Sequence, residues 1–130
     1  MPDFTTKQFD LTNNPEYTYY KLYVDGKCAF DDFLEEVKRN IADKKSLYSI
    51  IAYMDSLGAL MIPKTKFNHI EGSKRKDLFE FKKDRLRVYV IKQKPNIYIV
   101  MGGYKNTQKK DIYTLIHKTK DFPEQDNQID

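Results

Sequence analysis

The sequence predicts an α+β domain in which an antiparallel sheet packs against a helical hairpin. Two patterns support this fold class. Apolar residues recur at helical spacing between residues 29 and 57, and they alternate with period two between residues 77 and 101. A strand-like segment precedes the helices and a helical segment follows the last strand. The expected order is therefore β-α-α-β-β-β-α.

The first half of the chain should contain one strand and two helices. Residues 17–26, "YTYYKLYVDG", alternate as a half-buried strand does, and Asp25-Gly26 ends it. Two apolar stripes then predict helices, the first made by Phe30, Phe33, Leu34, Val37 and Ile41, the second by Leu47, Ile50, Ile51, Met54 and Leu57. Gly58 is placed to stop the second helix. The short connection predicts an antiparallel pair.

The second half should contain a basic loop at 63–77, three strands and a last helix. Leu86, Val88 and Val90 are expected in the core, which leaves the alternate residues on an open outer face. The apolar segment Ile97–Met101 should be a central strand that Gly102-Gly103 ends. Asn106 or Thr107 can cap the last helix. Its expected apolar side consists of Ile112, Leu115, Ile116 and Thr119.

Length and composition place limits on domain number and class. The 130 residues suit one domain at 1–122, followed by an acidic tail at 123–130 that we expect to be disordered. Cys28 is the only cysteine, so neither an internal disulfide nor a cysteine-based zinc site is expected. The apolar runs are too short to span a bilayer and no secretory signal is visible, so we expect a cytoplasmic protein without a membrane partner.

Charge is distributed unevenly along the chain. Residues 1–63 hold 7 Lys/Arg and 10 Asp/Glu, a net of −3. Residues 64–120 hold 16 Lys/Arg and 5 Asp/Glu, a net of +11. Such a basic region is typical of proteins that bind a polyanion, although an unbalanced solvated surface gives the same count.

The sequence contains little that indicates a metal site or a cofactor site. His69 and His117 lie 48 positions apart and have no cysteine partner. No P-loop is present, and the serines lie in no nucleophile motif. We therefore expect no metal and no cofactor.

Cations and aromatic residues on the outer face of the sheet and on the last helix suggest an RNA site. Cations hold phosphates, and aromatic rings stack unpaired bases. The candidate RNA-binding residues are Lys74, Arg75, Arg85, Tyr89, Tyr104, Lys109 and Lys110. For each aromatic residue alone, packing at the rim of the sheet is the simpler interpretation, and the clustering of cations on one face favours a polyanion site.

Residues 60–112 also resemble the RelE/HigB-like toxins of bacterial toxin–antitoxin systems, in the RelE/ParE superfamily. The family pattern has a proline-containing loop, three strand motifs and a G-F-x-K-K-T-Q motif before a final helix. Here the motifs read "LFEFK", "LRVYV", "NIYIV" and "GGYKNTQKKDI". With the helical pair, the resemblance covers residues 17–122. The family's arginine in the first motif is Lys82 here, and its C-terminal tyrosine corresponds to Phe122.

The resemblance implies a ribosome-dependent mRNA endoribonuclease that a cognate antitoxin neutralises. In this family the RNA 2′-hydroxyl attacks the neighbouring phosphate without a metal. The implied catalytic residues are Lys82 as base, Arg87 and Lys105 as phosphate ligands, and Tyr113 or His117 as acid or stacking platform. Two alternatives remain: a relative that binds a protein target, as ParE-like gyrase inhibitors do, and an RNA- or partner-binding module without turnover.

Overall fold

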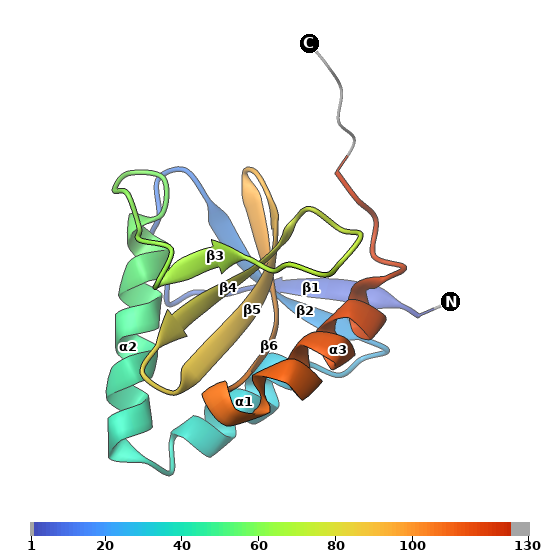
Figure 1. The fold of residues 1–130 in the computed structure, drawn as a ribbon. Helices are drawn as coiled ribbons and strands as arrows, with labels where there is room; N and C mark the ends of the chain where they lie inside the picture. The colour runs from blue at the N-terminus through green and yellow to red at the C-terminus, as the bar shows by residue number, and fades with distance from the viewer. Residues whose placement is uncertain (1, 126–130) are drawn as a thin grey trace.

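The computed structural model describes residues 2–125 and has an α+β fold with six strands and three helices (Figure 1). The acidic tail was expected to be disordered, and most of it, from residue 126 onward, lies outside the described residues. The elements are β1 (Phe4–Gln8), β2 (Thr18–Val24), α1 (Ala29–Val37), α2 (Ile41–Ser56), β3 (Phe67–His69), β4 (Leu78–Lys83), β5 (Leu86–Gln93), β6 (Asn96–Tyr104), a 3-10 turn (Lys105–Thr107) and α3 (Gln108–Thr119). No helix within residues 2–125 is long and apolar enough to cross a membrane.

The six strands form one mixed sheet in the order β1-β2-β6-β5-β4-β3. β2 and β6 run parallel, whereas every other neighbouring pair is antiparallel. The expectation of a purely antiparallel sheet is therefore wrong at this central pair. Two helices and three strands separate β2 from β6 along the chain, and a long connection of this kind can bring two strands together in parallel.

Two strands were not predicted. β1 pairs along its length with β2, and β3 pairs with β4 inside the segment expected to be a basic loop. Both are edge strands, and four of the five β1 residues are exposed. Edge strands with few apolar residues carry little alternation, so their pairing is decided by main-chain hydrogen bonds to the neighbouring strand.

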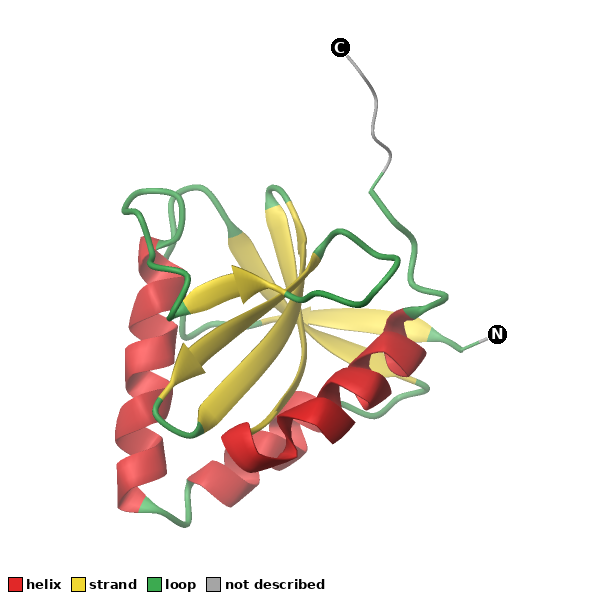
Figure 2. Ribbon diagram, in the orientation of Figure 1, coloured by secondary structure: helices red, strands yellow, loops and turns green. Residues whose placement is uncertain are grey.

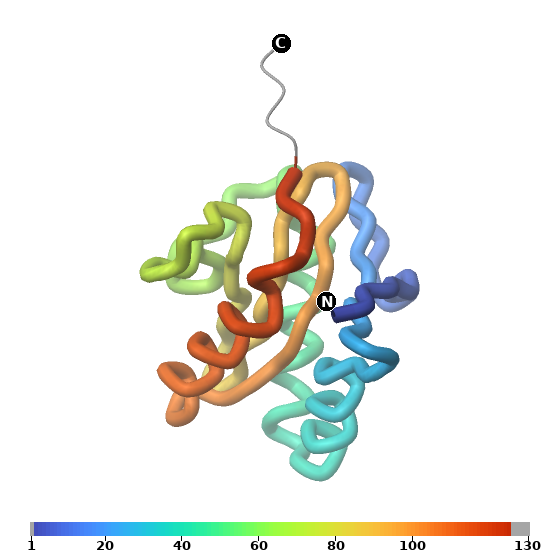
Figure 3. The backbone as a smooth tube through the Cα atoms, turned by 90° about the vertical axis from the view of Figure 1, so that its right-hand side faces the viewer, coloured from blue at the N-terminus to red at the C-terminus, as the bar shows by residue number. Residues whose placement is uncertain are grey.

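Helices cover both faces of the sheet. α1 and α2 lie on one face, where Phe30, Phe33 and Ile50 pack with Val88 and other strand residues. α3 crosses the opposite face (Figures 1 and 3), where its Leu115 joins a second buried cluster. β2 is accordingly buried on both sides, with Tyr19 in one cluster and Leu22 in the other, rather than half-buried as expected.

The two predicted helices form, but not as a close antiparallel pair. Figure 2 shows α2 along one edge of the molecule, with α1 meeting its lower end at an angle. Ile41, expected in the stripe of the first helix, is the first residue of α2 and is 76% exposed. Asn40 interrupts the helical run because its side chain accepts a hydrogen bond from the Asp43 amide and so begins α2.

β6 continues through both glycines that were expected to end it. A Cβ atom on Gly102 would meet the ring of Phe33 in α1, and one on Gly103 would meet the carboxylate of Asp111 in α3. The glycines therefore allow α1 and α3 to approach the same strand from opposite faces.

Candidate nucleic-acid interface

The most exposed aromatic residue among the predicted site residues is Tyr113 on α3, with 75% of its surface accessible. Lys109, Lys110 and His117 are exposed on the same side of the helix. We call these four residues the α3 stripe. The helix holds the stripe outward because its other side is anchored: Leu115 and Thr119 are buried, and Ile112 and Ile116 are half-buried against the sheet, as predicted.

The two lysines of the α3 stripe lie in the first turn of the helix. Cations are disfavoured there because the helix dipole places partial positive charge at the N-terminus. Together with Asn106, Thr107 and Tyr113, they line a surface hollow of about 510 Å³. An aromatic ring beside two cations in an open hollow can stack a base and contact its phosphate.

The strand face predicted to be open is instead covered by α3. Glu80 and Tyr89 lie opposite each other on β4 and β5, and both are buried. The Gln108 side chain, in the first turn of α3, donates a 2.6 Å hydrogen bond to the Glu80 carboxylate. The Asn68 side chain donates a second bond of 3.0 Å. Tyr89 therefore cannot stack a base as predicted, because it belongs to the core beneath α3.

Arg87 is also buried, with 7% of its surface exposed, and this corrects its predicted outward position. Its Nη1 donates to the carbonyl oxygens of Asp84 and Leu86, at 3.0 and 2.8 Å. The Arg87 Nε and the Tyr89 hydroxyl have no hydrogen-bond partner among the described residues. Burial, aided by the carboxylates of Glu80 and Asp111, raises the pKa of the Tyr89 hydroxyl.

Lys82 is a neighbour of Arg87 in the sheet, and Lys105 begins the 3-10 turn that follows β6. Lys82 is directly opposite Arg87, and Gly103, two residues before Lys105, is opposite Arg87 on the other side. Lys82 is partly exposed and Lys105 is exposed. Within residues 2–125 neither lysine forms an ion pair. The register thus brings three predicted catalytic residues to one end of the sheet, beside the start of α3.

Arg85 and Tyr104 are held by contacts on the other face. Arg85 makes two hydrogen bonds to the Asp43 carboxylate, of 2.9 and 2.6 Å, and lies 4.6 Å from the centre of the Tyr104 ring. The Arg85 guanidinium lowers the pKa of Asp43. The Tyr104 hydroxyl donates to Glu36 at 3.0 Å, and burial followed by this bond raises its pKa to about 12. Both predicted RNA-binding residues are thus engaged within the protein.

Arg75 fastens the end of α3 to the preceding loop. Its Nε and Nη2 donate to the two carboxylate oxygens of Asp77, each at 2.9 Å. Its Nη1 donates to the carbonyl oxygens of Thr119 and Phe122, at 3.0 and 2.5 Å. With 7% exposure and these four bonds, Arg75 is a structural residue rather than the RNA ligand that was predicted.

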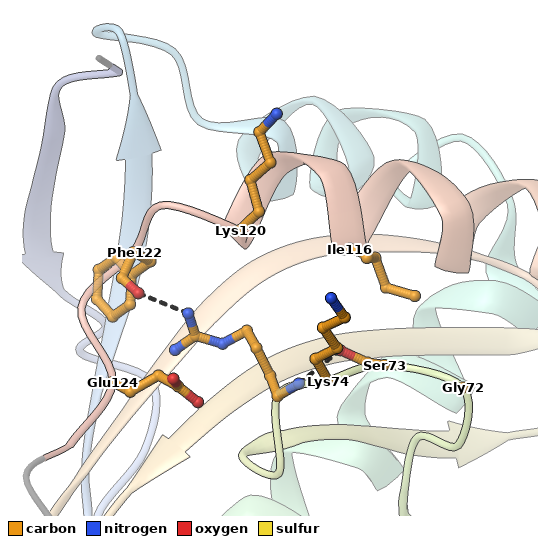
Figure 4. Close-up of a pocket in the computed structure, with 8 residues that line it drawn as sticks. Gly72, Ser73, Lys74, Ile116, Lys120, Phe122 and Glu124 are labelled. Carbon is orange, nitrogen blue, oxygen red and sulfur yellow. Dashed lines mark hydrogen bonds between the residues drawn. The ribbon is translucent and has the colours of Figure 1, made fainter.

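Beside Arg75 lies a pocket of about 540 Å³, which we call the α3 C-terminal pocket (Figure 4). Residues from the loop and from the C-terminal end of α3 form its walls. They are Gly72, Ser73, Lys74, Arg75, Ile116, Lys120, Phe122 and Glu124. Lys74 and Lys120 are exposed and form no ion pair within the described chain.

Sequence reasoning missed the partners that hold the charged residues. Asp43 and Asn68 lay in no motif, and Gln108 lay in the "GGYKNTQKKDI" motif without an assigned role, although each binds a charged side chain of β4 or of the β4–β5 turn. The period-two alternation of the strands placed Glu80 on the same sheet face as the cations. An acidic residue at that position was the one available sign in the sequence that this face was not open to RNA. No signal connects Glu124 with Lys74, since the two are distant in the sequence.

Within residues 2–125, no three His, Cys, Asp or Glu side chains gather in a way that could hold a metal ion. The RelE/HigB-like resemblance remains an expectation that four short motifs carry. Comparison of the chain with protein-family models, with curated proteins and with solved structures gives no match in any of the three.

Proposed function

We propose that this protein binds single-stranded RNA through the α3 stripe. The observation that carries the proposal is the exposure of Tyr113, 75% of whose surface is accessible, between Lys109, Lys110 and His117. Lysines bind phosphates of any sequence, and an exposed ring stacks a base that is not already stacked in a duplex. A membrane surface fits less well, because the apolar side of α3 is buried against the sheet.

The direct test is binding of a fluorescently labelled single-stranded RNA, followed by anisotropy. The double variant Lys110→Gln/Tyr113→Ala should bind about tenfold more weakly, because one stacked base alone contributes roughly 1–3 kcal/mol. A duplex of the same sequence should bind less tightly than the single strand.

α2 offers a matched control. Lys45 and Tyr48 have the same spacing as Lys110 and Tyr113, and Tyr48 is 62% exposed. Lys45→Gln/Tyr48→Ala should leave RNA affinity within twofold, which is about 0.4 kcal/mol. Equal weakening by both double variants would mean that general charge, and not the α3 stripe, binds the RNA.

A second candidate is the RelE-type, ribosome-dependent cleavage of mRNA. The strand register supports this candidate, because Lys82 and Gly103 lie opposite Arg87 on its two neighbouring strands and Lys105 follows Gly103 by two residues. The ribosome would hold the 2′-hydroxyl in line with the phosphate, a contribution that orientation can make large. The buried position of Arg87 makes Lys82→Gln and Lys105→Gln the informative variants, because both side chains reach solvent.

Primer extension on mRNA after induction of the protein tests this candidate. New 5′ ends in translated regions, lost in Lys82→Gln, would support cleavage. Intact mRNA together with altered DNA supercoiling would favour a gyrase-like protein target instead. Intact mRNA and unchanged supercoiling would leave RNA binding as the function.

The partners proposed with this function are mRNA, the ribosome and a cognate antitoxin. An antitoxin segment that is acidic could order on the α3 stripe and compete with RNA for Lys109 and Lys110. Co-purification of a small acidic or amphipathic protein that RNA displaces from the chain would support this partner. A complex that RNA does not disturb would place the antitoxin elsewhere.

A further inference from the structure

The α3 C-terminal pocket suits a ligand larger than a free ion. Its volume of about 540 Å³ falls in the range of small-molecule sites, roughly 300–1,000 Å³. Ile116 and Phe122 contribute apolar surface to its lining, Lys74 contributes a cation from the loop, and Lys120 contributes a second cation at its edge. Figure 4 shows Lys74 directed from the loop toward Ile116, whereas Lys120 rises from the end of α3.

The walls of this pocket are held in place before any ligand binds. Arg75 joins the loop to the Thr119 and Phe122 carbonyl oxygens, and Asp77 neutralises its charge. The Ser73 hydroxyl oxygen accepts a 3.0 Å hydrogen bond from the Arg75 amide, which leaves its proton free to donate. A preformed site avoids the entropic cost of ordering its walls when a ligand binds.

The charge of the pocket selects among anions. Lys74 and Lys120 supply two cations without an ion-pair partner in residues 2–125. An internal RNA phosphate carries one negative charge, whereas a terminal phosphate monoester carries about 1.5 to 2 at neutral pH. Lys74 beside a free hydroxyl, with Lys120 at the edge of the pocket, therefore matches a monoester better than a diester, and Ile116 offers the attached nucleoside an apolar contact.

We infer that the α3 C-terminal pocket binds the phosphorylated terminal nucleotide of an RNA strand. The inference rests on the proposed RNA binding, because the α3 stripe leads along the helix to Lys120 at the edge of this pocket. The α3 stripe would bind the internal nucleotides of the RNA, and the pocket would distinguish a phosphorylated end from a hydroxyl end.

Glu124 opposes this ligand. Among residues 2–125 it is the one carboxylate that lines the pocket, and a negative charge there repels a phosphate. Glu124→Gln should therefore increase the preference for a phosphorylated end. A decrease would show that the carboxylate helps the ligand and would overturn the charge assignment.

The test compares RNAs of one sequence that carry a 5′-phosphate, a 3′-phosphate or hydroxyls at both ends. One phosphorylated RNA should bind about tenfold more tightly than the hydroxyl form, the scale of one hydrogen bond to a charged group. Lys74→Gln should bring that ratio close to one. The ratio is informative even if the variant weakens all RNA binding, because the hydroxyl form is measured on the same variant.

Titration with 5′-AMP, followed by amide NMR shifts, tests the pocket independently of RNA binding. AMP should shift the amides of Ser73, Lys74 and Ile116, whereas adenosine and inorganic phosphate should bind at least about tenfold more weakly. Equal affinity for all three RNAs, or AMP shifts confined to the α3 stripe, would overturn the inference. AMP shifts at the pocket without any RNA binding would retain the pocket and refute the proposed function.

Discussion

Glu80 and Tyr89 occupy directly opposed positions on β4 and β5, yet within residues 2–125 only the Glu80 side chain has hydrogen-bond partners. Gln108 and Asn68 donate to its carboxylate, whereas the Tyr89 hydroxyl is buried without a partner among the described residues. Under α3, the Glu80 carboxylate is therefore hydrogen-bonded and the Tyr89 hydroxyl is not. Substitution of Tyr89 can test what the unpaired hydroxyl contributes to the free energy of unfolding.

Tyr89→Phe should leave the free energy of unfolding unchanged or raise it by about 1 kcal/mol, because the substitution removes a buried, unpaired hydroxyl. Tyr19→Phe is the matched control, since the Tyr19 hydroxyl is equally buried but donates a 2.9 Å bond to the Met54 carbonyl oxygen. The Tyr19→Phe substitution should lower the free energy of unfolding by about 1 kcal/mol. Urea denaturation measures both, and a clear loss for Tyr89→Phe would reveal a partner for its hydroxyl.

Gly102→Ala should lower the free energy of unfolding by about 2 kcal/mol, because its methyl group would collide with the Phe33 ring. Phe33→Leu in the same chain should recover part of the loss by removing ring atoms at the point of collision. Thermal unfolding of the single and double variants gives the comparison. Additive losses would mean that the glycine is required for another reason.

The Asp43–Arg85 pair predicts a pH-dependent contribution to stability. Arg85 lowers the pKa of Asp43 in the folded protein, so the stabilisation is present above the unfolded pKa of about 3.9 and is lost as the pH falls through the folded value. Asp43→Asn should therefore lower Tm by about 3 °C near neutral pH. Its difference from the parent protein should shrink below about pH 4.

The exposed Asp32 on α1 provides a control, because Asp32→Asn should change Tm little at either pH. A difference between Asp43→Asn and the parent that stays constant down to about pH 3 would show that the ion pair is not its source.

Arg75→Gln should release the end of α3 from the loop, because it removes the fork to Asp77 and the bonds to Thr119 and Phe122. Loss of a buried, paired arginine costs about 3 kcal/mol. Hydrogen exchange should become faster at residues 115–122 and remain unchanged in α2. Unchanged exchange at the end of α3 would show that other contacts hold the helix.

RNA affinity should fall as salt rises, because phosphate contacts release counterions. The logarithm of the binding constant should decrease linearly with the logarithm of salt concentration, by about 0.7 per phosphate contact on a single strand. Lys110→Gln should reduce the slope by about that amount, and Lys45→Gln should not. Binding that does not depend on salt would favour a protein target over RNA.

The α+β class and most elements followed from periodicity, because burial on one side imposes a spacing that the sequence displays. The stripe of Leu47, Ile50 and Met54 became a buried side of α2, and Gly58, with φ of 91°, follows its end. Leu115 and Thr119 likewise face the sheet from α3. Tyr113 and His117 are exposed because they lie opposite those anchors on the helix.

Only the tertiary structure decided which faces of the sheet meet water. Period two correctly put Arg87 and Tyr89 on the side away from α1 and α2, but it carries no information on what covers that side. α3 packs there through its apolar side, and Gly103 leaves room for Asp111, a contact between elements that local patterns do not encode. That contact buries the predicted strand site and leaves the exposed cations on the helix. The α3 C-terminal pocket depends in the same way on Arg75 bonding to carbonyl oxygens more than forty positions away, at Thr119 and Phe122.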